Sequence, residues 1–269
     1  MNFKLIKTEN FTYYERKSPE CNKNIIFIHG FATTSDYHNN FLRHLKNKFN
    51  YYAICLPGHG VAEVKDKKIL SPLNLAKHIV EWIKFMNLEN VYLIGHSMGG
   101  GISLLISNMM PNYFKKIVAV TPMNPSFSFK HLNIVKFVPK NNEQTFKMQH
   151  FILKDVQKFY KDENDHGIIK ETEYQLKNRE EFCYLRSNMM KPSNLINLRK
   201  AIKNTSYEIM IILGKHDNII DPKSAFKYFS KFNKFKIVNF ENSAHLPFWE
   251  EPEKYTKTIL EYFEQDKND

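Results

Sequence analysis

Ser97 lies between two glycines in the segment GHSMG, residues 95–99, and an apolar run borders this segment on each side. Residues 91–94 are bulky and apolar, as in a strand buried on both faces. Apolar residues recur at helical spacing from Ile102 to Met110. The pattern predicts a sharp strand-to-helix turn with Ser97 at its apex. A side chain at either flanking glycine would collide with neighbouring backbone if Ser97 adopted a strained, positive-φ conformation. A serine held in this way can act as a nucleophile.

A serine hydroxyl needs a base to take its proton, and the base needs a partner that fixes its tautomer. Open α/β sheets place such groups on loops at the carboxyl edge of the sheet, so the base and the acid are expected just after predicted strands. His245 follows the apolar run that ends at Phe240, and Asp217 follows the run that ends at Gly214. The predicted chemistry is nucleophilic catalysis by Ser97, with His245 as base and Asp217 as its orienting acid.

Other side chains compete for these roles. Asp221 directly precedes Pro222, which is typical of a helix N-cap followed by proline at the first helical position, so Asp217 is the favoured acid. Several histidines lie beside the same motifs: His29, His59, His96 and His216. They have neither the i, i+4 helical spacing nor the carboxylate partners of a metal site, so we interpret them as hydrogen-bonded loop histidines and expect no metal.

Strands and helices alternate along most of the chain. A hairpin is expected around Glu9 and Asn10, and Pro72 is expected near the first turn of a helix. Further strands are predicted within residues 24–30, 51–60, 115–122, 207–214 and 235–240, and further helices over residues 36–48 and from residues 222 and 252. Such alternation predicts an α/β fold with a mostly parallel central sheet and right-handed crossovers.

The alternation is interrupted between residues 123 and 204, where the pattern contains helix-like segments and no convincing strand. We interpret residues 123–204 as a helical cap or lid inserted into a core made of residues 1–122 and 205–269. The aromatic residues of the cap are expected to form helix core more than to line an acyl pocket: Phe127, Phe129, Phe137, Phe146, Phe151 and Phe159. Phe248 and Trp249, just after the proposed base, fit either role.

Composition limits the class of protein. The 269 residues are 42% hydrophobic and 25% charged, which is ordinary for a soluble globular protein. The net charge of +11 comes from dispersed lysines without an arginine-rich tract, so no nucleic-acid partner is expected; contact with an anionic membrane surface or an acidic substrate stays open. Three widely spaced cysteines and a polar N-terminal stretch lead us to expect a cytoplasmic protein.

Five motifs in order resemble the α/β-hydrolase superfamily, particularly its capped serine esterase/lipase group: FIHGFA, PGHG, GHSMGG, GKHDNIIDP and AHLPFWEEP. The order Ser97, Asp217, His245 is also that of this superfamily. The resemblance implies an α/β-hydrolase fold with a helical cap, no cofactor, and an oxyanion hole made by the backbone N–H groups of Phe31 and Met98.

The resemblance and the residues together predict a serine hydrolase that cleaves small-molecule carboxylic esters through an acyl-enzyme. Two alternatives use the same fold differently. The same triad could act on a thioester or a C–C bond, or the chain could be a non-catalytic binding protein on a hydrolase scaffold. A serine nucleophile argues against the dehalogenase and epoxide-hydrolase branches, which the resemblance associates with aspartate at this position.

Overall fold

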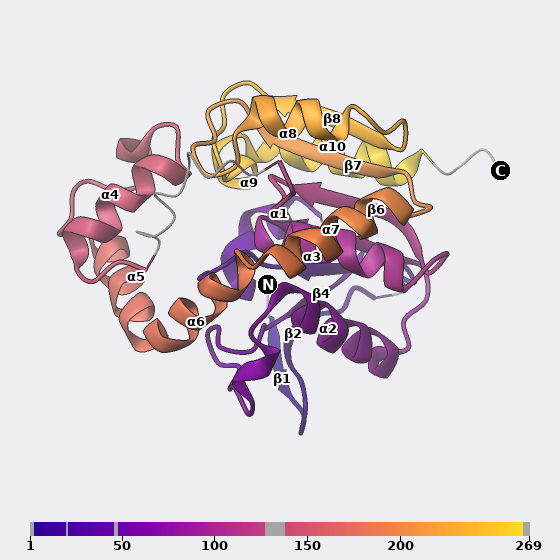
Figure 1. Cartoon of the computed structure of the whole chain (residues 1–269), viewed down its shortest axis with the longest axis horizontal. Coiled ribbons are helices and arrows are strands. Elements are labelled where there is room, and N and C mark those ends of the chain that lie inside the picture. The colour runs from indigo at the N-terminus through magenta and orange to yellow at the C-terminus, as the bar shows by residue number, and fades with distance from the viewer. Residues whose placement is uncertain (1–2, 20, 46–47, 127–137, 266–269) are drawn as a thin grey trace.

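The computed structural model describes residues 3–19, 21–45, 48–126 and 138–265. It contains an eight-stranded sheet with strand order β1-β2-β4-β3-β5-β6-β7-β8 (Figure 1). The strands are β1 (Lys4–Lys7), β2 (Thr12–Arg16), β3 (Asn24–Ile28), β4 (Asn50–Ile54), β5 (Val91–His96), β6 (Phe114–Val120), β7 (Ile209–Gly214) and β8 (Phe235–Phe240). The expected α/β fold with a mostly parallel sheet is confirmed.

The two edges of the sheet differ in direction. β1 and β2 form the expected antiparallel hairpin, in which Lys7 pairs with Thr12, and β2 runs antiparallel to β4. From β4 to β8 every neighbouring pair is parallel. The carboxyl ends of six strands therefore meet at one edge, where the loops that carry chemistry are expected.

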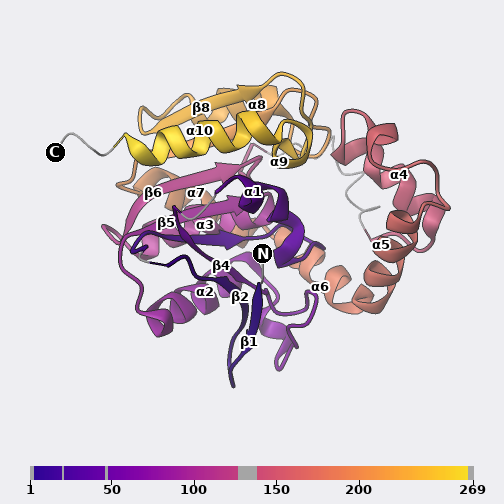
Figure 2. The same cartoon turned by 180° about the vertical axis from the view of Figure 1, so that it is seen from behind.

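Helices cover both faces of the sheet because alternate side chains of each buried strand point in opposite directions (Figures 1 and 2). In β3, Ile26 and Ile28 join one apolar cluster, and Ile25 and Phe27 join the other. The first cluster includes residues of α2 (Pro72–Met86), α3 (Met98–Met109), α7 (Pro192–Asn204) and α8 (Pro222–Phe229). The second includes residues of α1 (Asn39–His44), α9 (Pro247–Glu250) and α10 (Pro252–Glu264).

The described residues between β6 and β7 include α4 (Asn142–Ile152), α5 (His166–Lys177) and α6 (Arg179–Met189), which we call the outer helices. Both views show them beside the sheet and not on either face (Figures 1 and 2). The described part of residues 123–204 contains no strand. α7 completes the same connection, but it packs against α3, and its Leu198 and Ile202 belong to the first core cluster.

The prediction of one helix over residues 36–48 is wrong in extent. The chain forms a 3₁₀ turn, η1 (Ser35–His38), and then the short α1, which ends at His44. Phe41, Leu45 and Phe49 are nevertheless all buried. Phe49 contacts the rings of Tyr92 and Phe263 from the segment that leads into β4, so its place in the four-residue spacing reflects tertiary packing and not a longer helix.

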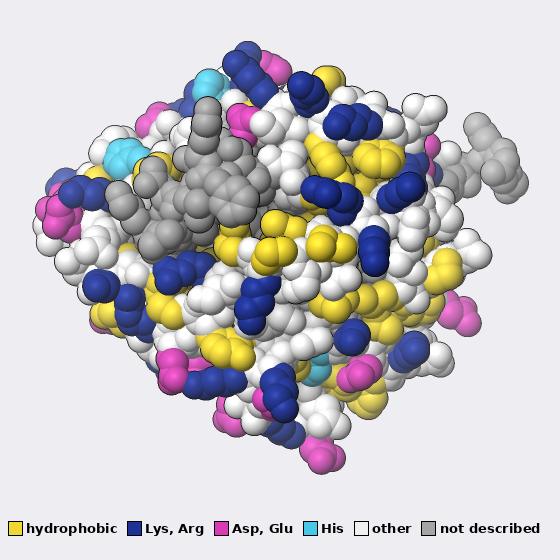
Figure 3. Space-filling view, in the orientation of Figure 1, with side chains coloured by type: hydrophobic (Ala, Val, Ile, Leu, Met, Phe, Trp, Pro, Cys, Tyr) yellow, Lys and Arg dark blue, Asp and Glu magenta, His cyan; other side chains and the backbone are white. Residues whose placement is uncertain are grey.

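The surface is basic but mixed. On the face of Figure 1, Lys and Arg side chains are spread over the molecule with acidic side chains between them (Figure 3). The cysteines Cys21, Cys55 and Cys183 are free. Over the described residues, no helix combines the length and the apolar character needed to cross a bilayer.

Candidate active site

The turn between β5 and α3 holds Ser97 in a strained conformation, with φ 53° and ψ −115°. Its N–H donates to the carbonyl of Val120 at 2.9 Å, and its carbonyl accepts from the N–H of Met123 at 2.9 Å and that of Gly101 at 3.0 Å. The predicted positive-φ turn is confirmed. Backbone hydrogen bonds from two neighbouring segments hold the strain in place.

The two flanking glycines are required by close backbone approach. A Cβ on Gly99 would lie 2.7 Å from the carbonyl carbon of Ile28, and one on Gly95 would lie 2.7 Å from the carbonyl carbon of Gly99. Both distances are shorter than real Cβ contacts, and both neighbours are backbone that cannot rotate away. The predicted collision is therefore confirmed, and it places the start of α3 directly against β3.

The structure brings Ser97, His245 and Asp217 into one hydrogen-bonded chain. His245 Nε2 lies 2.9 Å from Ser97 Oγ, and His245 Nδ1 lies 2.7 Å from Asp217 Oδ2. Because an ionised carboxylate only accepts, Nδ1 carries the imidazole proton and Nε2 accepts from the serine hydroxyl. Both the histidine and the aspartate are buried, so water competes little for these bonds.

Backbone groups orient the Asp217 carboxylate. Its Oδ1 accepts from the N–H groups of Ile219 at 2.7 Å and Ile220 at 2.9 Å, which leaves Oδ2 for the histidine. Asp221, the competing acid, caps α8 instead by accepting from the N–H of Ser224 at 2.8 Å. The predicted N-cap role of Asp221 is therefore confirmed.

The loop that carries His245 is fastened from three sides. The carbonyl of His245 accepts from His96 Nε2 at 3.0 Å and from Thr121 Oγ1 at 3.2 Å, which connects the loop to the ends of β5 and β6. The N–H of His245 donates to the carbonyl of Ile152 at 2.8 Å, at the end of α4. The outer helices thus contact the histidine loop directly.

Gly30 brings the loop after β3 against the serine. A Cβ at this position would lie 3.3 Å from Ser97 Cβ, so the backbone that leads into Phe31 passes close to the serine. Met98 is the first residue of α3, where a backbone N–H has no partner within its helix. The structure thus places the two predicted donor residues on the two segments that flank Ser97.

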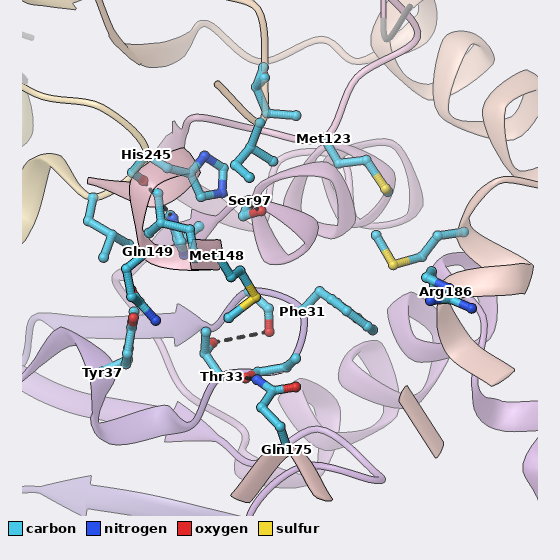
Figure 4. A pocket seen from close by; sticks show the side chains of 18 of the residues that line it. Phe31, Thr33, Tyr37, Ser97, Met123, Met148, Gln149, Gln175, Arg186 and His245 are labelled. Carbon is cyan, nitrogen blue, oxygen red and sulfur yellow. Dashed lines mark hydrogen bonds between the residues drawn. The ribbon is translucent and has the colours of Figure 1, made fainter. Parts of the chain in front are cut away.

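A pocket opens at Ser97 between the sheet edge and the outer helices (Figure 4). Its lining includes the residues of the serine turn and the histidine loop together with side chains from α4, α5 and α6. A little more than half of all the lining residues are apolar, and methionines are prominent: Met123, Met148, Met189 and Met190. Such a concave, mostly apolar site with a few polar groups is typical of small-molecule binding.

A family model described as the alpha/beta hydrolase family matches residues 25–258, which is most of the chain. The chain belongs to the α/β-hydrolase family. Among curated proteins it is similar to "Putative esterase/lipase 3" of Mycoplasma pneumoniae, with 28% identity over 262 residues that cover 95% of this chain and 92% of that protein.

A second curated relative is the "Pimeloyl-[acyl-carrier protein] methyl ester esterase" of Wigglesworthia glossinidia brevipalpis. It is 28% identical over 250 residues, which cover 89% of this chain and 93% of the relative. Among solved structures, a serine hydrolase from Cycloclasticus zankles superposes with a TM-score of 0.85 at 16% identity, covering 100% of this chain and 99% of that one. At this identity the structural likeness shows the shared α/β-hydrolase fold alone.

Two of the remaining motif histidines hold loops of this hydrolase. His29 Nδ1 donates to the carbonyl of Gly30 at 2.9 Å, and its Nε2 accepts from the N–H of Leu56 at 3.1 Å. His59 Nε2 accepts from the N–H of Ala32 at 3.1 Å. Burial lowers the pKa of His29 to about 4 and lowers that of His59 well below its usual value. Both rings therefore stay neutral and can accept, as hydrogen-bonded loop histidines should.

The other two differ from each other. His216 is exposed and its ring contacts the carbonyl of Glu241 at 3.1 Å. His96 is buried, and its Nδ1 has no hydrogen-bond partner. Among the residues that the structure describes, no three His, Cys, Asp or Glu side chains are grouped so that they could hold a metal ion.

The aromatic residues of the segment 123–204 differ in their burial. Phe146 and Phe159 pack against the second core cluster, and Phe151 is 37% exposed. Phe127, Phe129 and Phe137 lie outside the described residues. Phe248 is buried in the second cluster, and Trp249 Nε1 donates to the carbonyl of Tyr37 at 2.9 Å. Neither of the last two side chains lines the pocket.

Sequence reasoning missed polar side chains of the outer helices that line the pocket: Gln149 of α4, Glu171 and Gln175 of α5, and Arg186 of α6. It also missed Tyr174, whose hydroxyl donates to the carbonyl of Thr33 at 3.0 Å in the loop after β3. No sequence signal distinguishes these residues from other polar residues on amphipathic helices, because only the packing of the outer helices turns them toward the site.

Proposed function

We propose that this protein hydrolyses carboxylic esters with Ser97 as the nucleophile. The observation that carries the proposal is the hydrogen-bonded chain from Asp217 through His245 to Ser97 at the base of the pocket. The printed names of the relatives, an esterase/lipase and a methyl ester esterase, support the choice of an ester bond.

In the proposed reaction, His245 Nε2 takes the proton of Ser97 as Oγ bonds to the carbonyl carbon of the ester. The tetrahedral intermediate then breaks its bond to the alcohol oxygen, which leaves with the proton from Nε2. Water repeats these steps on the acyl-enzyme, releasing the acid and regenerating the serine. Asp217 holds the imidazole in the required tautomer and stabilises its charged form.

The oxyanion of each intermediate is proposed to bind the N–H groups of Phe31 and Met98. Removal of one such donor has cost about 3 to 4 kcal/mol in other serine hydrolases. The N-terminus of α3 adds a favourable dipole because Met98 is its first residue.

We further propose that the segment of residues 123–204 acts as a cap whose helices cover the pocket and exclude water. Its contacts with the histidine loop, through Ile152, support this role. We place the activity in the cytoplasm because the three cysteines are free, as is usual in a reducing compartment. A small-molecule ester is the proposed binding partner.

The experiment is intact-mass analysis after treatment with a fluorophosphonate, on wild type and on Ser97→Ala. We expect one adduct on the wild type and none on the variant, with ester turnover reduced by about 10⁵-fold in the variant. The circular-dichroism spectrum of both proteins serves as the folding control. An adduct or full ester turnover in folded Ser97→Ala would contradict the proposal.

A further inference from the structure

The pocket has two sides of unlike chemistry. Figure 4 shows Gln149 and Tyr37 on the His245 side of Ser97, and Met123 on the opposite side. Burial raises the pKa of the Tyr37 phenol, and the negative charge of Glu171 raises it further. Glu171 therefore lies near Tyr37 and belongs with the first group. We call the region of Tyr37, Gln149, Glu171 and Gln175 the polar arm. The region of Met123, Met189, Met190 and Leu195 is the apolar arm, and one charged side chain, Arg186, lies on the same side of Ser97 (Figure 4).

The hydrogen bonds of Gln175 fix the orientation of its amide. Nε2 donates to the carbonyl of Ala32 at 3.1 Å and to Glu171 Oε1 at 2.8 Å. The Ala32 carbonyl can only accept, so turning the amide round would lose this bond and set two carbonyl oxygens against each other. Gln175 Oε1 is therefore an acceptor, and it is buried without a hydrogen-bond partner.

Gln149 of α4 also has a buried amide oxygen, Oε1, without a hydrogen-bond partner. Gln149 and Gln175 are each only 1% exposed. A buried carbonyl oxygen without a partner costs about 1 to 3 kcal/mol, so two such groups in one pocket indicate atoms that a ligand satisfies. With the Glu171 carboxylate, the polar arm offers acceptors from three side chains.

The reaction determines which part of the substrate faces these acceptors. The leaving alcohol takes its proton from His245 Nε2, so the alcohol must lie on the His245 side of Ser97. α4 is held to this side by the bond from the His245 N–H to the carbonyl of Ile152, three residues after Gln149. The acyl chain is then directed to the apolar arm.

We propose that the polar arm binds the alcohol part of the ester and selects alcohols that carry further hydroxyl groups. This inference rests on the proposed function and names its substrate class. Hydroxyl groups match the arm because Gln175 Oε1 is a neutral acceptor that requires a donor, and because a hydroxyl both donates and accepts and so can pair with the buried Gln149 amide. A site built to bind a hydroxyl discriminates against an analogue without it, since its buried acceptors are then left unpaired.

The experiment compares kcat/KM for three butyrate esters that share the acyl group: 2,3-dihydroxypropyl, n-propyl and choline. We expect wild type to favour the dihydroxypropyl over the propyl ester by at least about 10-fold. In Gln149→Leu this ratio should fall about 10-fold, because one acceptor is lost. The matched control Gln157→Leu changes an exposed glutamine outside the pocket lining and should keep the wild-type ratio.

A measurement on wild type alone avoids any effect of the variants on folding. Glycerol should inhibit propyl butyrate hydrolysis more strongly than propanol does, since it can satisfy the acceptors of the polar arm. An unchanged ester ratio in folded Gln149→Leu, or equal inhibition by the two alcohols, would overturn the inference. Preference for the choline ester would overturn it too, because that cation has neither an O–H nor an N–H donor.

The outcomes separate this inference from the proposed function. Turnover of both neutral esters through Ser97 with no preference overturns the polar-arm assignment and leaves the ester hydrolase intact. Absence of turnover together with absence of a fluorophosphonate adduct overturns both.

Discussion

The serine turn and the outer helices build opposite walls of one pocket by different means. Around Ser97, backbone packs on backbone, as where Gly99 lies against β3. In the outer helices, side chains make the contacts, as where Tyr174 and Gln175 bond to the loop after β3. The two kinds of contact therefore have different roles. Backbone contacts set the geometry of the reacting atoms, and side chains that can be exchanged more readily set what the pocket accepts.

The largest expected difference between the two regions is in their tolerance of an added methyl group. Gly99→Ala places a Cβ against the backbone of Ile28 and should lower the free energy of unfolding by about 4 kcal/mol or prevent folding. Gly167→Ala in α5 meets the ring of Tyr160, a side chain that can move, and also gains helix propensity, so its effect should stay within about 1 kcal/mol. Urea denaturation of both variants measures the contrast, and equal effects would contradict it.

A second expected effect is a loss of stability at acidic pH. Burial lowers the pKa values of four core histidines: His29, His38, His59 and His96. Below pH 6.5, the ordinary pKa of histidine, the unfolded chain binds protons at these side chains and the folded chain does not. The stabilising contribution of the neutral buried rings is therefore complete above pH 6.5 and is lost as the pH falls toward 4. For His29, with its pKa of about 4, the free energy of unfolding lost over this pH range is about 3 kcal/mol.

Urea unfolding at pH 7.5 and pH 5.0 tests this expectation. Stability should be lower at pH 5.0, and the difference should persist in His166→Gln, which changes an exposed histidine of α5. The difference in stability between the two pH values should be smaller in His38→Gln, which removes one of the buried imidazoles. The same free energy of unfolding at both pH values in wild type would count against the idea.

The smallest expected effect tests how the outer helices support the core. Tyr174→Phe removes the hydroxyl that donates to Thr33 and accepts from the N–H of Gly60 at 3.3 Å, in loops beside the serine. We expect kcat to fall about 5-fold with KM unchanged, since the loop that carries Phe31 is proposed to act on the transition state. Tyr184→Phe on α6, where the tyrosine is exposed, is the matched control. A raised KM with normal kcat would assign Tyr174 to substrate binding instead.

Much of the core was predictable because its signals are local. The strand-to-helix turn at Ser97, the N-cap at Asp221 and the proline at the start of α2 each depend on neighbours in the chain. The extent of α1 was not predictable, since Phe49 is buried by contacts with Tyr92 and Phe263, which are distant in sequence.

The sequence by itself determined the α/β alternation, the strained serine and the residues brought together with it, because glycine spacing, strand ends and residue order are properties of the chain. Only the tertiary structure decided that Gln149 and Gln175 line the pocket and that each carries a buried oxygen without a hydrogen-bond partner. Their orientation depends on where α4 and α5 pack against the edge of the sheet, and a helix with several polar residues carries no local signal for which of them will face a ligand.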